Sequence, residues 1–572
     1  MKFLRESTSA PDHSAARNAF VAIVIFFVAH VLLLVGVTTP EKFYFDEVHY
    51  VPAARQMLEP DMSAPMLNPM HPPLGKQLIA LSIATFGDGP LGWRYPGVLF
   101  GSLAIVAIYF CGLALFAGQG PAVAAALLAF FNQMLFVQSR IAMLIGVTTP
   151  EKFYFDEVHY VPAARQMLEP VMPQPMLNPM HPPLAKQFIA LSIHSFGDGP
   201  LGWRYPGVLF GSLAIVAMYL CGLALFAAQV PAIAASLLAF FNQMLFVQSR
   251  IAMLDIFALT FSLFAIAAFM HGFRKGRPHL WFALAGFGFG LFGIAAFMHG
   301  FRKSRPHLWF ALAGLAFGLS IACKWSGLFA LATCIVITAL IRLMQSWRTQ
   351  FADGNANDWY RPKQWPGFGY THLAACFVLI PALVYVATFI PLYGWSLSDI
   401  VEAQRRIFGD NTTTAIAGHT YMSAWTSWPL LVRPVWYLFD KIGDDRIAAV
   451  VFLGNPLLLW PALPALVVCL RDWIVTRRAD AFLILSFYFG PYLAWAVLPR
   501  TLGFLYYYLP SATIASLALV YALRRGNSPR WLLWVFVAIA FAGFAAMLPI
   551  SAAFVGTSMQ TFNRLMIFQN WI

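Results

Sequence analysis

The sequence predicts an all-α polytopic membrane protein. Of its 572 residues, 60% are hydrophobic and 11% are charged, and apolar runs long enough to cross a bilayer recur from end to end. The formal net charge is +13, but Lys and Arg lie in short clusters between these runs, as in Arg471 to Arg478 and Arg524 to Arg530. That distribution is typical of the cytoplasmic loops of membrane proteins and argues against a nucleic-acid-binding groove.

The first apolar run, roughly Ala19 to Val37, is too long and too uninterrupted for the core of a signal peptide. We expect it to be a retained first span that leaves the N-terminus in the cytoplasm. The polar segment that follows it, Pro40 to Arg94, would then lie on the extracytoplasmic side of the membrane. Two further apolar runs, Gly97 to Ala117 and Pro121 to Ser139, then form a hairpin of spans.

The segment that follows the first span is duplicated in tandem. Residues Gly36 to Leu144 recur as Gly146 to Leu254 with scattered differences, and both copies contain the string FDEVHYVPAARQMLEP, from Phe45 and from Phe155. Each copy holds one external loop and two spans. Insertion of a second copy therefore leaves the orientation of the downstream chain unchanged.

A smaller duplication of 28 residues repeats the segment from Ile266 at Ile294. It adds one apolar run, Leu280 to His299, and a true crossing there would place the later basic clusters outside. We expect instead a re-entrant hairpin or a distorted helix with both ends cytoplasmic.

The remaining apolar runs predict the spans 308–323, 326–343, 372–392, 448–470, 482–498, 509–523 and 531–550. The predicted organisation is a cytoplasmic tail and first span (1–35), repeat copy one (36–144), repeat copy two (145–254), central spans (255–345), a cytoplasmic loop (346–371) and C-terminal spans (372–572) with a long external loop (393–445).

This topology gathers the polar residues on the outer side, where external loops would form an active site. They are Asp46, Glu47, Arg140, Asp156, Glu157, Arg250, Asp255, Lys324, His419, Arg433, Arg500 and Tyr506 to Tyr508. The six cysteines lie within or at the ends of apolar runs without metal-ligand spacing, so we expect buried thiols.

At these residues the sequence resembles the protein O-mannosyltransferase family. The matching motifs are the FDE segments, HPPLGK (to Lys76) and HPPLAK (to Lys186), SRIAMLD (249–255), CKWSGLF (from Cys323), HTYMSAWTSWPLLVRPVWY (from His419) and FLYYYLP (from Phe504). The resemblance implies a type-C glycosyltransferase-like helical bundle that uses a polyprenyl or dolichyl phosphate-mannose donor. The sequence departs from the family in its duplications and in lacking a soluble module between the central spans, as in the shorter bacterial members.

Such an enzyme needs a base, because an acceptor hydroxyl must lose its proton as it attacks the anomeric carbon. The family implies this role for the first acid of the pair, so the catalytic candidates are Asp46 with Glu47 and Asp156 with Glu157. An acidic pair that only caps a surface helix is the structural alternative. We favour the pair in copy two, because that copy continues directly into the complete motif ending at Asp255.

The leaving group is a lipid phosphate, which cations can receive. The candidates are Arg250, Lys324, Arg433 and Arg500, with snorkelling at a span end as the alternative for each one alone. For Asp255 the sequence leaves three roles open: contact with the substrate, a structural ion pair, and the cap of a helix.

The motifs also point to substrate contacts at His181, Lys186, Trp325, His419 and Tyr507. A turn-packing role is the alternative for His181, because it precedes two prolines. For the aromatic residues around His419 and Tyr507 there are two alternatives. They form a belt at the membrane interface, or their rings stack on the sugar and the acceptor peptide. No metal-ligand spacing is visible, so we expect neither metal nor cofactor, with the lipid-linked sugar acting as a substrate.

The sequence therefore predicts an integral enzyme of the plasma (inner) membrane that transfers mannose from polyprenyl phosphate-mannose, with inversion, to Ser or Thr of proteins on the extracytoplasmic side. A lipid-directed transferase resembling aminoarabinose transferases is the enzymatic alternative. A transporter would place ionisable residues at mid-span and carry inverted repeats, unlike this sequence. An inactive duplicated product is a further alternative.

Overall fold

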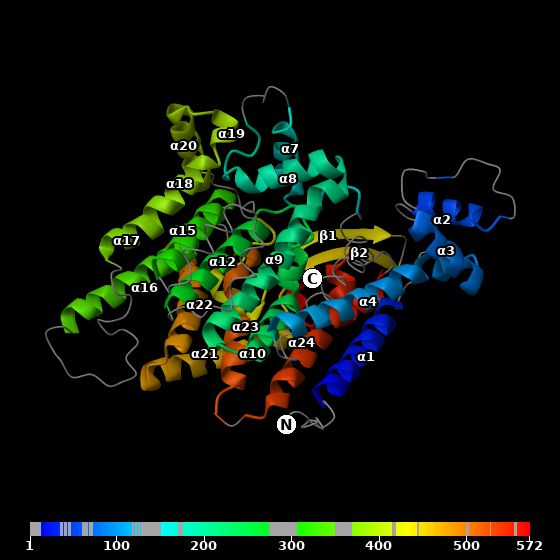
Figure 1. Ribbon diagram of the computed structural model, residues 1–572. Coiled ribbons are helices and arrows are strands. Elements are labelled where there is room, and N and C mark those ends of the chain that lie inside the picture. Colours follow the sequence, from blue (N-terminus) through cyan, green and yellow to red (C-terminus); the bar gives the residue numbers. More distant parts are fainter. Residues whose placement is uncertain are drawn as a thin grey trace, which may run out of the picture. The chain divides into compact units, whose positions relative to one another are not determined.

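The computed structural model describes residues 13–34, 38, 43, 47–59, 67, 73–116, 119, 123, 126, 150–169, 176–273, 306–348, 369–413, 419–442, 445–498, 503–526, 528–553 and 557–571. The protein forms two compact units, Met1–Ile141 and Ala142–Ile572. The first unit holds the first predicted span and copy one, and the second holds copy two and everything that follows it (Figure 1). The run Leu280 to His299 lies outside the described residues, so its predicted path stays a prediction.

The first unit is helical in its described part, with α1 (His13–Leu34), α2 (Glu47–Gln56), α3 (Pro73–Phe86) and α4 (Pro90–Phe116). Helix α1 packs against α4 through a small apolar cluster that includes Ala29, Val98 and Ile105. Within this contact, His30 Nδ1 lies 3.2 Å from Ser102 Oγ.

The second unit is a helical bundle with a small sheet. Its helices are α7 (Glu157–Gln166), α8 (Leu184–Phe196), α9 (Pro200–Phe226), α10 (Gln229–Phe240), α11 (Gln243–Gln248), α12 (Asp255–Phe273), α15 (Pro306–Cys323), α16 (Gly327–Arg348), α17 (Tyr370–Ala374), the π-helical turn η3 (Ala375–Leu379), α18 (Ile380–Ala387), α19 (Ile390–Tyr393), α20 (Leu397–Thr413), the 3₁₀ turn η4 (Trp425–Leu430), α21 (Pro456–Thr476), α22 (Ala479–Val497), the 3₁₀ turn η5 (Leu505–Tyr508), α23 (Leu509–Leu523), α24 (Arg530–Ser551), α25 (Met559–Leu565) and the 3₁₀ turn η6 (Gln569–Trp571). Every residue of α12 is buried, and α9, α15 and α16 pack around it (Figure 1).

Eight helical segments among the described residues are long and apolar enough to cross a membrane. They are Pro90–Phe110, Pro200–Phe226, Asp255–Phe273, Tyr370–Tyr393, Pro456–Thr476, Ala479–Val497, Leu505–Leu523 and Trp531–Ser551. The predicted polytopic helical class is confirmed. The predicted span 448–470 is wrong at its start, because α21 begins only at Pro456, where the Asn455 side chain caps it by accepting from Leu457 N.

An antiparallel sheet, which the all-α prediction missed, follows η4. It is formed by β1 (Val435–Ile442), β2 (Arg446–Phe452) and β3 (Thr557–Ser558), in that order. In the register of the β1–β2 hairpin, Val435 pairs with Phe452 and Ile442 with Arg446. The strands are rich in β-branched and aromatic residues, which suit a half-buried pleated surface.

The two repeat copies fold alike within their own units. In copy one, Arg94 Nε lies 2.7 Å from Glu47 Oε1, and in copy two Arg204 Nε lies 2.7 Å from Glu157 Oε1. A second ion pair, Arg55 with Asp88, also has its counterpart in copy two. The local fold is therefore encoded within the repeat itself.

The long helices of the two copies nevertheless bury opposite faces. Ile105 of α4 is 1% exposed, whereas its counterpart Ile215 in α9 is only half-buried. Conversely, Phe210 of α9 is 5% exposed and its counterpart Phe100 in α4 is 50% exposed. The reason is that α4 packs on α1, whereas α9 packs on α12 and α10. Copy two is thus the copy built into the core of the larger unit.

Candidate active site

Asp156 occupies the N-cap position of α7, directly after the left-handed residue Phe155 (φ 51°). Its carboxylate is half-buried, makes no capping hydrogen bond to the helix, and accepts no hydrogen bond from any residue that the structure describes. Burial raises the pKa of the Asp156 carboxyl; the charge of Lys324 opposes this rise and that of Asp255 adds to it. An uncommitted carboxylate with a raised pKa is suited to accept a proton.

The strained backbone at Phe155 is held by aromatic contacts. The Phe155 ring stacks on Tyr437 of β1, with centroids 4.2 Å apart, and meets Tyr506 edge-on at 6.1 Å. The Tyr437 hydroxyl donates to Gln248 Oε1 at 3.2 Å. A non-glycine residue in the left-handed region persists only where its surroundings fix it. The sheet and η5 therefore fix the turn that carries Asp156.

Asp255 and Lys324 form a buried ion pair beside Asp156. Lys324 Nζ donates to both carboxylate oxygens of Asp255 at 2.8 Å, and it lies 5.3 Å from the centre of the Tyr506 ring. Of the roles that the sequence left open for Asp255, the structure shows the ion pair, with Lys324 as the partner. A lysine ammonium has three donors, so two bonds to Asp255 leave one donor for a ligand.

Glu157 has an anchoring role in this geometry, in contrast to the predicted catalytic one. It is fully buried, and Arg204 donates to both of its carboxylate oxygens at 2.7 and 2.8 Å. The backbone N–H groups of Ala252 and Tyr154 also donate to it, at 3.0 and 3.3 Å. Both oxygens are occupied, so Glu157 ties the loop of copy two to the segment before α12.

Arg250 also contacts protein groups where the sequence predicted a lipid phosphate. Its guanidinium is 3% exposed and donates to the carbonyl oxygens of Ser551 at 3.3 Å and Ala552 at 3.2 Å, at the end of α24. A cation is favourable there because the last carbonyls of a helix carry negative partial charge. The geometry favours a capping role for Arg250.

The lysine of the HPPLAK motif is turned inward. Lys186 is fully buried and donates to the carbonyl oxygens of Asn178 at 2.7 Å and His181 at 2.9 Å. Burial lowers the pKa of Lys186 to about 7. The His181 ring lies 5.9 Å from that of Tyr160. Lys186 thus fixes the turn, and the alternative of turn packing is the better description of this motif.

The other predicted contacts differ in accessibility. His419 is exposed and lies close enough to Asp156 that a positive charge on it would lower the pKa of the Asp156 carboxyl. Arg433 is exposed and, within the part of the protein that the structure describes, forms no ion pair. Trp325 donates to the Tyr385 hydroxyl at 3.0 Å, and Tyr507 stacks on Trp495 at 4.2 Å.

Three predicted polar residues lie outside the described residues, and their predicted roles stay predictions. They are Asp46, Arg140 and Arg500. The described pair Glu47–Arg94 repeats the anchoring contact of Glu157 in copy one.

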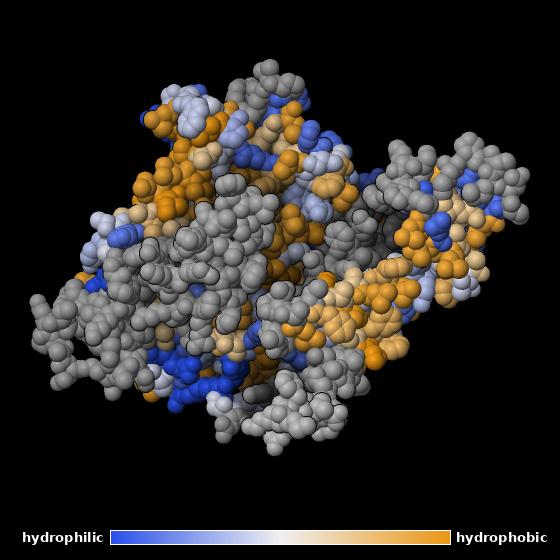
Figure 2. Space-filling view, in the orientation of Figure 1, coloured by the Kyte–Doolittle hydropathy of each residue, from blue (hydrophilic) through white to orange (hydrophobic). Residues whose placement is uncertain are grey.

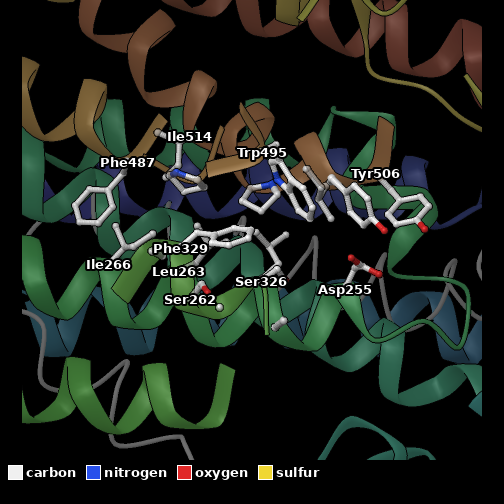
Figure 3. A pocket seen from close by; sticks show the side chains of 18 residues that line it. Asp255, Ser262, Leu263, Ile266, Ser326, Phe329, Phe487, Trp495, Tyr506 and Ile514 are labelled. Atoms are coloured by element: carbon white, nitrogen blue, oxygen red, sulfur yellow. The ribbon is translucent and has the colours of Figure 1, made fainter. Parts of the chain in front are cut away.

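An apolar pocket leads away from the ion pair (Figure 3). It lies between α12, α16, α22 and α23, where about 620 Å³ of space not filled by atoms is partly open to solvent. Asp255 and Tyr506 line one end, whereas Ile266, Phe487 and Ile514 line the other. The pocket therefore has a polar end at Asp255 and an apolar end among the candidate spans, an arrangement that suits a lipid with a charged headgroup.

Sequence reasoning missed Arg204, Gln248 and Tyr437. Arg204 follows the acidic pair at the same distance as Arg94 does in copy one, but the tandem duplication alone explains this spacing, so it carries no separate signal. For Gln248 and Tyr437 we also find no signal, since 189 residues separate the two partners of their hydrogen bond.

The helical bundle with an acidic site at the polar end of an apolar pocket is a membrane glycosyltransferase of type-C fold. One subunit in the solved structure of the S. cerevisiae protein O-mannosyltransferase Pmt1-Pmt2 complex bound to the sugar donor has the same fold. The TM-score is 0.56 at 14% identity, covering 92% of that subunit and 77% of this protein.

Sequence comparisons identify the family. Family models match residues 396–571, as the C-terminal four-span region of protein O-mannosyltransferase, and residues 180–294, as dolichyl-phosphate-mannose-protein mannosyltransferase. The polyprenol-phosphate-mannose–protein mannosyltransferase of Mycolicibacterium smegmatis is 28% identical over 87% of its own length and 73% of this sequence. The enzyme of the same name from Corynebacterium glutamicum is 26% identical over 76% of its own length and 64% of this sequence. The protein belongs to the protein O-mannosyltransferase family.

Proposed function

We propose that this protein transfers mannose from polyprenyl phosphate-mannose to Ser or Thr hydroxyls of proteins, with inversion at the anomeric carbon. The observation that carries the proposal is the uncommitted carboxylate of Asp156 beside the Asp255–Lys324 pair, at the polar end of an apolar pocket. The names of the curated relatives supply the sugar and the class of acceptor.

In the proposed reaction, the acceptor oxygen forms a bond to the anomeric carbon while the bond from that carbon to the phosphate oxygen breaks. The hydroxyl proton passes to an oxygen of Asp156. The lipid phosphate leaves with the bonding electron pair, and the third N–H of Lys324 is placed to receive its charge. The exposed cation Arg433 is a second candidate for the phosphate.

The test of this function is transfer of labelled mannose from polyprenyl phosphate-mannose to a Ser/Thr-rich peptide in membranes that contain the protein. Transfer to the peptide supports the proposal. Transfer only to a glycolipid would show the lipid-directed alternative, and no transfer with either acceptor would contradict the mannosyltransferase assignment. We expect a chelator to leave transfer unchanged, because the proposed charge stabilisation uses side chains alone.

We further propose that the site faces the outside of the plasma membrane. The support is the distribution of charge, because Arg471, Arg478 and Arg525 lie at the span ends away from Asp156, as the positive-inside rule requires. The exposed Thr426 of η4, changed to Cys, should react with a membrane-impermeant maleimide in intact cells. Reaction only after the cells are opened would reverse the orientation.

We predict that the Lys324→Met variant moves the acid limb of the pH–rate profile to higher pH. The active form of Asp156 is the deprotonated one, and its pKa is already raised by burial. Loss of the Lys324 charge removes an interaction that lowers this pKa and leaves Asp255 without its counter-charge, so both changes raise the pKa further. The measurement is kcat/KM against pH.

The control for this prediction is the double variant Asp255→Asn/Lys324→Met, which removes both charges. Its acid limb should move less than that of Lys324→Met. An acid limb that stays in place in Lys324→Met would contradict the assignment of Asp156 as the titrating base.

A further inference from the structure

Two basic clusters that are distant in the sequence come together in the second unit. One comprises the end of α21 and its connection to α22, and the other lies at the end of α23. We call the following residues the arginine cluster: Arg471, Arg477, Arg478, Arg524 and Arg525.

A buried aspartate holds the two connections together. Asp472 is 3% exposed; Arg525 Nε lies 2.9 Å from its Oδ2, and Arg471 Nη1 lies 3.3 Å from its Oδ1. The Tyr521 hydroxyl donates to the same carboxylate at 3.1 Å. A second buried acid, Asp480, forms an ion pair with Arg478, whose Nη2 lies 2.7 Å from Asp480 Oδ2. The arginines are therefore fixed in place by contacts beneath them.

The cluster carries more positive charge than these contacts neutralise. The three arginines Arg471, Arg478 and Arg525 share the two carboxylates of Asp472 and Asp480, and their side chains remain 55%, 55% and 41% exposed. A guanidinium has five N–H donors in a planar fork, so an edge used on an aspartate leaves other donors for a ligand. Outward-facing guanidinium groups fit phosphate oxygens better than any other side chain does.

The position of the cluster selects a membrane ligand. Helices α21, α22 and α23 belong to three candidate spans, and the cluster lies at their ends. Arg478 directly precedes α22, whereas Trp495, near the other end of this helix, lines the pocket beside Asp255. Figure 2 shows hydrophilic side chains gathered at the lower edge of the molecule, over the ends of α21 and α22. Span ends lie at the level of lipid headgroups.

We propose that the arginine cluster binds the phosphate of an anionic phospholipid headgroup in the membrane leaflet farther from Asp156. Asp472 acts as the positioning residue of this lipid site, because it holds arginines from both connections. The site is separate from the pocket proposed for the sugar donor.

The test uses the full-length protein in detergent, freed of native lipid, with added phosphatidylglycerol or phosphatidylcholine and native mass spectrometry as the readout. We expect phosphatidylglycerol adducts on the wild type and few phosphatidylcholine adducts. The variant Arg471→Gln/Arg525→Gln should bind phosphatidylglycerol more weakly, by about fivefold for each arginine removed. Equal binding of both lipids by the wild type would overturn the proposal.

The matched control is Arg405→Gln/Arg406→Gln, which removes the same charge from two exposed arginines of α20 whose ion pairs among the described residues are with Glu402. This variant should bind phosphatidylglycerol as the wild type does. If it lost as much binding as Arg471→Gln/Arg525→Gln, the effect would be one of net charge and not of the arginine cluster. A salt titration of the wild type needs no variant and therefore excludes misfolding; the adducts should decrease as salt screens the contact. Binding of soluble glycerol phosphate as tight as that of the lipid would also overturn the membrane assignment.

Discussion

The Asp156→Asn variant is expected to transfer mannose about 10³-fold more slowly than the wild type, within the range that general-base catalysis contributes. The amide cannot take the proton of the acceptor hydroxyl, while its size preserves the turn that Phe155 and Tyr437 fix. Binding of the lipid donor should persist, because the Asp255–Lys324 pair and the apolar pocket are untouched. The measurement is single-turnover transfer of labelled mannose together with donor binding.

The repeat supplies the matched control for this variant. Asp46 precedes Glu47 in the same motif of copy one, and we expect Asp46→Asn to transfer mannose at the wild-type rate. The opposite result, with loss in Asp46→Asn and normal transfer in Asp156→Asn, would assign the active site to copy one. Loss of donor binding in Asp156→Asn would mean that the residue binds the donor and is not the base.

The Glu157→Gln variant is expected to destabilise the second unit by about 3–5 kcal/mol, because it leaves the buried charge of Arg204 without its counter-charge. Both side chains are fully buried, and Arg204 also donates to the carbonyl oxygens of Pro150 and Lys152 at 3.0 Å. The loop that carries Asp156 should loosen as a result. The measurement is the midpoint of thermal unfolding of the purified protein.

The equivalent change in copy one, Glu47→Gln, should have a smaller effect. The Glu47 side chain is 18% exposed and that of Arg94 is 7% exposed, so water screens the charge that remains. If Glu157→Gln unfolds at the wild-type temperature but still loses transfer, Glu157 has a direct chemical role and our anchoring assignment is wrong.

The sequence was sufficient to predict the polytopic helical class, the family and the clustering of Asp156 with Asp255 and Lys324. Each of these rests on long apolar runs or on motifs that keep their order along the sequence. The preference for copy two also came from the sequence, because only this copy continues into Asp255. The structure adds that the charge of Lys324 lowers the pKa of the Asp156 carboxyl.

The roles of Glu157, Arg250 and Lys186 could not be read from the sequence. Each has the residue type that a substrate site needs, and only the fold shows that its polar atoms are already bound to Arg204 or to backbone carbonyls. The hairpin β1–β2 was missed because its apolar residues continue into those of α21. Gly454 to Pro456, which separate the hairpin from the helix, are residues typical of a turn. A prediction of spans from hydropathy alone passes over them.

Copy two, together with α12, α16, α22 and α23, is expected to form the site for the lipid-linked sugar. Photo-crosslinking with a polyprenyl phosphate that carries a diazirine in its lipid tail, followed by peptide mapping, tests it most directly. We expect label on peptides from α12, α16, α22 or α23, which line the apolar pocket. Label confined to residues 73–116 of copy one would contradict it.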